Sequence, residues 1–265
     1  MTIALGILTN DGVVLAADTE ETMLGGTWKS DHGKITAVTA KAGNGRNSCV
    51  ISGAGDALYI DDVTVRLREC VKSHRELTEA EIVNDKFPAI LQRFYADHVI
   101  PFSGYSFEDR PDVNLLVGYD FQGVPGLLAS QHNLFVRASP FKAVGVGSGV
   151  AETLLARFFM PWPDVQRAIL MAAYVMFHVK ESVPGCGKAT DIWGLAQGRL
   201  FTLRRKQTKP LESAIEDYSY AVEPFMLHDV LGLEVAATEK RPVKAARLTL
   251  RKALNAITAT LKPRA

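Results

Sequence analysis

The chain has 265 residues, 47% of them hydrophobic and 22% charged, with a formal net charge of +1 at pH 7. These values are typical of a globular protein, either one large domain or one domain with an added segment. A net charge near zero argues against a general polyanion binder, and we expect neither nucleic acid nor a membrane as partner. Three scattered cysteines are too few for a disulfide framework or a zinc site.

No targeting or membrane-spanning segment is predicted. The first apolar stretch, Ile3 to Leu8, is short, has no preceding basic residue and runs into a turn, unlike a secretory signal. The longest apolar segment, Ala168 to Val179, is shorter than a membrane span and is interpreted as a buried helix. Together with the cysteine usage, this favours a cytoplasmic protein.

In chain order, strand patterns alternate with pairs of helical patterns. Asp11-Gly12 separates the first two apolar runs and predicts a hairpin. The ranges of the first half are strands Ile3–Thr9, Val13–Asp18, Lys34–Thr39 and Ser48–Ser52, then helices Asp56–Ser73 and Thr78–His98. Those of the second half are strands Asp112–Tyr119, Gly126–Ser130 and Ala143–Val146, helices Ala151–Phe159 and Asp164–Glu181, and strands Thr190–Ala196 and Arg199–Leu203.

This order of elements predicts an α+β fold. Helix pairs, rather than single crossover helices, separate the strand clusters, which disfavours a doubly wound parallel sheet. The order suits two antiparallel sheets stacked face to face with a helix pair on each outer face, although the pattern does not itself decide whether the sheets stack.

Residues 205–265 are predicted to form an extension to a domain at 1–204. Pro242 opens an amphipathic helix whose other face is basic, with Lys244, Arg251 and Lys252. We expect this helix to pack on its own domain or on a neighbouring subunit. Contact with nucleic acid or a membrane is the alternative, and the neutral overall charge weakens it. The apolar positions of the helix are Val243, Leu250, Leu254, Ile257 and Leu261.

Thr2 is a candidate nucleophile because it directly follows the initiator methionine. A threonine hydroxyl needs a base to take its proton, and removal of Met1 would free the α-amino group of Thr2 for that task. An α-amine has an unperturbed pKa of about 8, so a good share is neutral at physiological pH. Lys34 and Asp18 lie at strand ends. There Lys34 could lower the pKa of the Thr2 hydroxyl, and Asp18 could orient Lys34. Taken singly, each is more commonly an ordinary surface residue.

The stretches TIALGILTNDGVVLAADTEET and SDHGKI resemble the opening of the proteasome β-subunit family and its bacterial relatives, which are N-terminal-nucleophile hydrolases. The resemblance places the nucleophile on Thr2, the orienting aspartate on Asp18, the lysine on Lys34 and a substrate-contacting threonine on Thr22.

Two later stretches extend the resemblance, ISGAGDA and VGVGSGVAETLLA. They place an oxyanion-hole N–H on Gly53, a wall of the specificity pocket on Ile51 and a supporting catalytic serine on Ser148. From the residues alone, Ser148 could equally be the N-cap of a helix.

Over residues 2–204, the resemblance implies a four-layer αββα sandwich that hydrolyses peptide bonds with no metal or organic cofactor. It also implies a homo-oligomeric ring enclosing a chamber, with peptides or unfolded proteins as substrates and an ATPase as a possible partner.

The match fails at KESVPGCG, where the family has an Asp-x-x-Ser-Gly pattern. Glu181 occupies the carboxylate position, and Pro184, which has no donor, occupies the serine position. Ser182 or Asp191 are possible substitutes. Glu20 replaces a family arginine. Glu20 and Glu21 either select basic substrate side chains or face solvent, and we favour solvent.

Three hypotheses follow. The first is a threonine endopeptidase that acts through Thr2 after Met1 removal. The second is a non-catalytic proteasome-type subunit that builds or gates an assembly, motivated by the altered residues at 181 and 184. Against it stands a chain that starts at the threonine, without a helical N-terminal extension. The third is an amidase on small substrates.

Overall fold

The computed structural model describes residues 2–23, 28–43, 45–74, 76–102, 104, 110–158, 163–230 and 240–261. The chain divides into two compact units, Met1–Thr202 and Leu203–Ala265. Within the described ranges, no helix combines the length and apolar character needed to span a membrane.

The first sheet of the larger unit has the strand order β10-β1-β2-β11-β12. The predicted hairpin is present, since β1 and β2 pair antiparallel with Leu5 opposite Ala16. β2 is buried along its whole length, which fits a central strand covered on both faces. The bounds are β1 Ile3–Thr9, β2 Gly12–Asp18, β10 Phe141–Gly145, β11 Thr190–Ala196 and β12 Arg199–Leu203.

The second sheet has the strand order β5-β6-β7-β8-β9, with antiparallel pairing between all neighbours. A small two-stranded ribbon, β3 and β4, lies between β2 and β5 in the chain. The bounds are β3 Glu20–Met23, β4 Trp28–Asp31, β5 Ile35–Ala42, β6 Gly45–Gly55, β7 Val113–Phe121, β8 Val124–Gln131 and β9 Leu134–Arg137.

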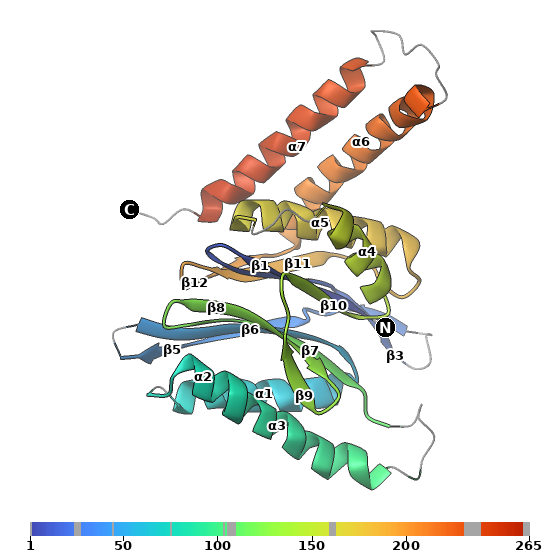
Figure 1. Cartoon of the computed structure of the whole chain (residues 1–265). Helices are drawn as coiled ribbons and strands as arrows, with labels where there is room; N and C mark the ends of the chain where they lie inside the picture. The colour runs from blue at the N-terminus through green and yellow to red at the C-terminus, as the bar shows by residue number, and fades with distance from the viewer. Residues whose placement is uncertain are drawn as a thin grey trace. The chain divides into compact units, whose positions relative to one another are not determined.

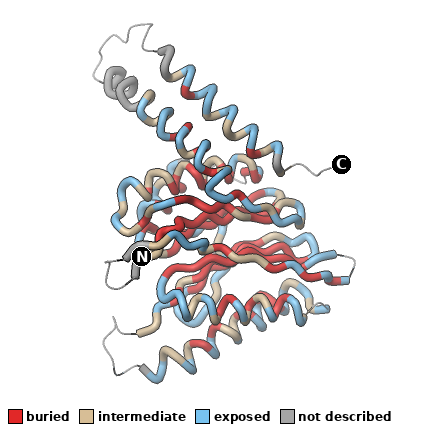
Figure 2. Tube along the Cα trace, turned by 180° about the vertical axis from the view of Figure 1, so that it is seen from behind, coloured by how far each residue is buried: buried red, intermediate tan, exposed pale blue. Residues whose placement is uncertain are grey.

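The two large sheets stack face to face, and helices cover both outer faces (Figure 1). One apolar cluster joins the sheets, with Val13 and Leu15 from the first and Val50, Leu116 and Leu127 from the second. Buried residues accordingly form two central bands in Figure 2. The predicted α+β fold, a four-layer αββα sandwich, is confirmed.

Below the second sheet in Figure 1 lie α1 (Ala57–Ser73), α2 (Glu79–Glu81) and α3 (Phe87–Phe94), and above the first lie α4 (Ser148–Phe158) and α5 (Val165–Ser182). A helical turn at Ile82–Lys86 joins α2 to α3, and further turns at Tyr95–Val99 and Ile100–Phe102 continue the same helical segment beyond α3. Thr78 begins this segment with a capping box, in which its hydroxyl and the Glu81 side chain cap each other's backbone N–H groups.

The sequence did not predict β3, β4 or β9. These strands have four residues each, and β9 is mostly exposed, so none carries a clear apolar alternation. It also did not predict α6 (Arg205–Val230), whose polar composition gives a weak helical pattern.

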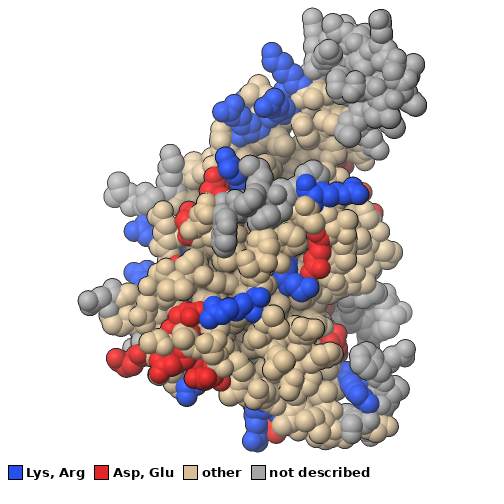
Figure 3. All heavy atoms as spheres, in the orientation of Figure 1, with Lys and Arg blue, Asp and Glu red and all other residues tan. Residues whose placement is uncertain are grey.

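The smaller unit consists of α6 and α7 (Lys240–Leu261), which contact each other. Leu211, Ala214 and Ile215 of α6 are buried, as are Ala246 and Ile257 of α7. The basic residues Lys244, Arg251 and Lys252 of α7 are exposed, as expected from the sequence. Figure 3 shows basic and acidic side chains interspersed over the visible face of the larger unit, so no single sign of charge dominates there.

Candidate active site

Thr2 lies directly before β1 at the edge of the sandwich and is buried. Its carbonyl accepts a hydrogen bond from the N–H of Val146, at 3.0 Å. A Cβ built on Gly145 would overlap this carbonyl, and Gly145 has a φ of +98°. The close approach of β10 therefore requires glycine at this position, and it fixes the backbone of Thr2.

Lys34 connects the two sheets at Thr2. It directly precedes β5 of the second sheet, whereas Asp18 ends β2 of the first. The ammonium Nζ donates to Thr2 Oγ1, to Asp18 Oδ1 at 2.8 Å and to the backbone carbonyl of Glu20. These contacts use all three N–H donors of the lysine. A cation in contact with Oγ1 stabilises the deprotonated hydroxyl, which is the nucleophilic form.

Asp18 is held in place by backbone groups as well as by the lysine. Its side chain is 0% exposed, and that of Lys34 is 11% exposed. Oδ1 also accepts from the N–H of Ile3 at 3.1 Å, and Oδ2 accepts from the N–H of Gly187 at 3.0 Å. These donors satisfy the buried carboxylate, which in turn fixes the direction of Lys34.

Two clefts meet at Thr2. The first, of about 850 Å³, is lined by Thr2, Lys34, Ile51 and Gly53. Ser52, directly before Gly53, is the last residue of β6 paired with β5. Gly53 therefore lies where that ladder has ended, and Ile51, a buried core residue, contributes to the wall of the cleft.

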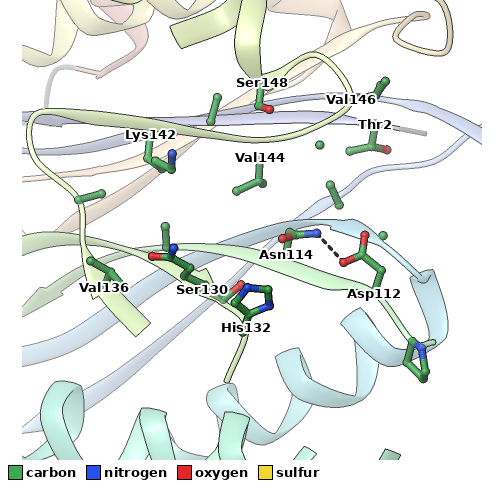
Figure 4. Close-up of a pocket in the computed structure, with 18 of the residues that line it drawn as sticks. Thr2, Asp112, Asn114, Ser130, His132, Val136, Lys142, Val144, Val146 and Ser148 are labelled. Atoms are coloured by element: carbon green, nitrogen blue, oxygen red, sulfur yellow. Dashed lines mark hydrogen bonds between the residues drawn. The ribbon is translucent and has the colours of Figure 1, made fainter. Parts of the chain in front are cut away.

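The second cleft, of about 1280 Å³, lies on the Ser148 side of Thr2. Figure 4 shows Ser148 and Val144 on one wall, with Asp112 and Asn114 on the facing wall. The amide of Asn114 donates to Asp112 Oδ1 at 2.8 Å. Burial, aided by the nearby charge of Asp56, raises the pKa of Asp112 despite this hydrogen bond.

The structure thus brings together Thr2, Asp18 and Lys34, and it places Gly53, Ile51 and Ser148 on the clefts beside them. Ser148 is the first residue of α4, so the N-cap position falls on Gly147. The backbone of Thr22 lies in β3, and its side chain is outside the described residues.

Glu181 and Ser182 are not brought to Thr2. Both are exposed at the end of α5, and the hydroxyl of Ser182 donates to the carbonyl of His178 in its own helix, at 2.7 Å. Within the described part of the chain, neither contacts Thr2, Asp18 or Lys34. The loop after α5 reaches the cluster by another route, because the N–H of Gly187 holds Asp18.

Glu20 was misjudged from the sequence, whereas for Cys186 the sequence predicts packing as a small apolar residue and leaves a role at the site open. Glu20 does not face solvent as we expected, because it is only 6% exposed. Cys186 is a free, buried thiol. Burial and the negative charge of Asp18 raise its pKa to about 11, against the opposing charge of Lys34. The position of Cys186 after Gly185 was the signal in the sequence, since small residues allow a loop to pack closely against a site.

In this fold a buried threonine directly before the first strand contacts a lysine that directly precedes the second of two stacked sheets. Solved structures with this fold resemble the chain over most of its length. Anbu from Yersinia bercovieri, described as an ancestral β-subunit, has a TM-score of 0.67 at 14% identity and matches 88% of this chain and 98% of its own.

Two further Anbu structures are similar. The Anbu complex of Pseudomonas aeruginosa, described as a helical assembly, has a TM-score of 0.66 at 16% identity, over 89% of this chain and 99% of its own. A Gly-1 mutant of Anbu from Hyphomicrobium sp. strain MC1 has a TM-score of 0.63 at 14% identity, over 96% and 97%.

The family expected from the sequence is corrected by these findings. No protein-family model matches the chain, and no curated protein matches it. The solved chains named above are Anbu proteins, so the assignment to the proteasome β-subunit family is wrong.

Proposed function

We propose that this chain is a threonine-type hydrolase of peptide bonds, with Thr2 as nucleophile once Met1 has been removed. Met1 itself lies outside the described residues. The observation that carries the proposal is the contact of Lys34 Nζ with both Thr2 Oγ1 and Asp18 Oδ1. A buried ammonium held by a buried carboxylate against a single hydroxyl favours the nucleophilic form of that hydroxyl.

The reaction needs only groups of this chain and water. Thr2 Oγ1 attacks the scissile carbonyl carbon while its proton passes to the free α-amine of Thr2, directly or through water. The N–H of Gly53 is the proposed donor to the resulting oxyanion. Collapse expels the amine half of the substrate, which takes the proton from the α-ammonium, and leaves an ester on Thr2. Water then hydrolyses the ester, with the α-amine again as base.

The two clefts favour an extended polymer over a small amide as substrate. Both clefts are lined by Thr2, and one of them is also lined by Gly53 and the other by Ser148. A peptide that binds in both would place an internal bond at Oγ1, which corresponds to endopeptidase activity. Small amides would fill only part of one cleft.

We also propose that copies of this chain associate. The similarity to the Pseudomonas aeruginosa chain, which is described in a helical assembly, supports self-association. Sedimentation should show a species of several subunits, and electron microscopy then distinguishes a closed ring from an open helix. A stable monomer at micromolar concentration contradicts this part of the proposal.

The nucleophile is tested by intact mass and by turnover of fluorogenic peptides. We expect the purified chain to lack Met1 and to hydrolyse peptides. Thr2→Ser, which keeps a hydroxyl, should retain part of the turnover, and Thr2→Ala should have none. Retention of Met1 in every subunit without turnover overturns the proposal and leaves a non-catalytic subunit. Equal turnover by Thr2→Ala excludes Thr2 as the nucleophile.

A further inference from the structure

Glu20 is a buried acidic residue whose backbone contacts the lysine of the Thr2 site. Its backbone carbonyl accepts from Lys34 Nζ, the same ammonium that contacts Thr2 Oγ1. Its side chain lies against the loop after α5, since a Cβ built on Gly187 would overlap Glu20 Oε2. Only glycine at position 187 therefore leaves room for the carboxylate.

The position of Glu20 is fixed by the network that also holds Asp18. The N–H of Gly187 donates to Asp18 Oδ2 at 3.0 Å. Thr19 and Ala189, which follow in the same two segments, are joined by two hydrogen bonds of 3.0 Å. The Ala189 N–H donates to Thr19 Oγ1, and the Thr19 N–H donates to the Ala189 carbonyl. The segment 18–20 and the loop 186–189 thus form one hydrogen-bonded unit beside Thr2.

The charges around this unit come from several elements. Asp18 of β2 and Glu20 of β3 contribute carboxylates, and Lys34 contributes an ammonium group. Asp191 of β11 is also close, with Oδ2 at 3.5 Å from a Cβ built on Gly33. The carboxylate of Glu21 accepts from the hydroxyl of Ser30. Two further groups belong to the loop after α5, the buried thiol of Cys186 and the exposed ammonium of Lys188.

We propose that Glu20 is a positioning residue for the α-amino group of Thr2. Its carboxylate favours the ammonium form of this amine and thereby sets the pH at which the site becomes reactive. This inference rests on the proposed role of Thr2 and extends it. A nearby anion in a poorly solvated site raises the pKa of an amine, whose ordinary value is about 8. The amine accepts the hydroxyl proton only when it is neutral, so Glu20 moves the acid limb of the reaction to higher pH.

The charge of Glu20 acts on a second group of the same unit. Besides burial and the charge of Asp18, the charge of Glu20 contributes to the raised pKa of Cys186. Cys186 Sγ lies near Ile3, because a Cβ built on Gly147 would meet both Cys186 Sγ and Ile3 Cβ at 3.2 Å. Glu20, Cys186 and Thr2 therefore belong to one compact region, in which the Glu20 carbonyl and Thr2 Oγ1 contact the same Lys34 ammonium.

The first test measures the α-amine without any need for turnover. The chain is produced with a removable leader so that Thr2 is its first residue. Competitive acetylation with acetic anhydride across pH, read by mass spectrometry of the N-terminal peptide, gives the pKa of the amine. We expect Glu20→Gln, which keeps the shape of the side chain, to lower this pKa by about one unit. An equal pKa in wild type and Glu20→Gln overturns the inference.

Two matched variants control for the loss of a charge as such. Glu21→Gln removes the neighbouring carboxylate, which is turned to Ser30, and Glu69→Gln removes an exposed carboxylate of α1 that pairs with Lys72. We expect the pKa of the Thr2 amine to stay at its wild-type value in Glu69→Gln and to move less in Glu21→Gln than in Glu20→Gln. A shift of the same size in all three variants overturns a specific role for Glu20.

The second test follows kcat/KM with pH. In Glu20→Gln the acid limb should move to lower pH by the same interval as the amine pKa, and the high-pH rate should fall because a weaker base remains. A merely structural role would lower the rate equally at all pH values, and that result overturns the inference. An amine shift without turnover in any variant supports the inference and rejects the proposed hydrolase. Turnover without an amine shift does the reverse.

A steric variant provides an independent route to the same carboxylate. Gly187→Ala forces the Glu20 side chain away from its position, so the amine pKa should fall as in Glu20→Gln. In a Glu20→Ala background the added methyl group has room, and it should cause no further change. An equal effect of Gly187→Ala in both backgrounds contradicts the inference.

Discussion

The larger unit contains two clusters built from the same three chemical parts, a hydroxyl, a carboxylate and a cation. In the first, Lys34 contacts the hydroxyl of Thr2, and Asp18 contacts Lys34. In the second, which joins α2 to β7 and β9, the hydroxyl of Tyr119 donates to Glu79 at 2.6 Å and accepts from Arg137 at 2.7 Å.

The order of contacts gives the two hydroxyls opposite properties. Burial and the hydrogen bond and charge of Glu79 raise the pKa of Tyr119, so its proton is held more tightly. Thr2 instead accepts from a cation and has no carboxylate as hydrogen-bond partner within the described residues, an arrangement that favours loss of its proton. The first cluster is suited to chemistry, and the second is suited to joining a helix to a sheet.

The largest expected effect comes from removing the cation of the first cluster. Lys34→Met leaves Asp18, which is fully buried, without its ammonium partner. We expect turnover to fall by about 10³-fold or more, and the free energy of unfolding to fall by about 3 kcal/mol. Urea unfolding and peptide hydrolysis measure the two effects. The equivalent change in the second cluster, Arg137→Met, should cost only about 1 kcal/mol, because the Arg137 side chain is 53% exposed.

A charge-preserving variant separates the two effects of Lys34→Met. Lys34→Arg keeps a cation beside Asp18, but a planar guanidinium cannot place one nitrogen against three acceptors as the ammonium does. Most of the stability should return while turnover stays low. Full recovery of turnover in Lys34→Arg would show that charge alone is sufficient and that the contact with Oγ1 is not required.

The two clusters also differ in how far the sequence could predict them. Thr2, Asp18 and Lys34 lie at strand ends, and the hairpin signal at Asp11-Gly12 places the first two at one edge of a sheet. The second cluster joins residues 40 positions apart, Glu79 and Tyr119, whose contact depends on how α2 packs on the sheet. No local pattern records that packing.

The same limit explains the misjudged residues beside Thr2. Glu20 reads as a polar residue after a strand, and its burial follows from contact with Gly187, far along the chain. The prediction of Glu181 and Ser182 as site residues assumed that side chains of α5 contact the groups around Thr2. The structure uses a backbone N–H from the next loop instead, and a backbone donor leaves no residue type to recognise.

A smaller effect is expected from removing the hydroxyl of the second cluster. Tyr119→Phe deletes one donor and one acceptor but leaves the ion pair of Glu79 and Arg137, whose atoms are 2.8 Å apart. We expect the free energy of unfolding to fall by about 1 kcal/mol and peptide turnover to stay at the wild-type rate. A loss of turnover comparable to that of Lys34→Met would contradict the division between a chemical and a structural cluster.

The smallest effect concerns the pH dependence of the second cluster. Burial alone would raise the pKa of Glu79, but hydrogen bonds from Arg137 and Tyr119 outweigh it and hold the pKa below its ordinary value. A carboxyl group whose pKa is lowered on folding stabilises the protein above its unfolded pKa, and this contribution is lost as the pH falls through the folded value. Since Arg137 is half exposed, solvent limits the contribution to about 0.5 kcal/mol.

Urea unfolding between pH 3 and pH 7 should therefore show a small stability gap between wild type and Glu79→Gln at neutral pH that closes in acid. With Glu69→Gln, whose ion pair is exposed, the gap should be smaller still. A gap for Glu79→Gln that stays constant down to pH 3 would show that the carboxylate charge is not what stabilises this cluster.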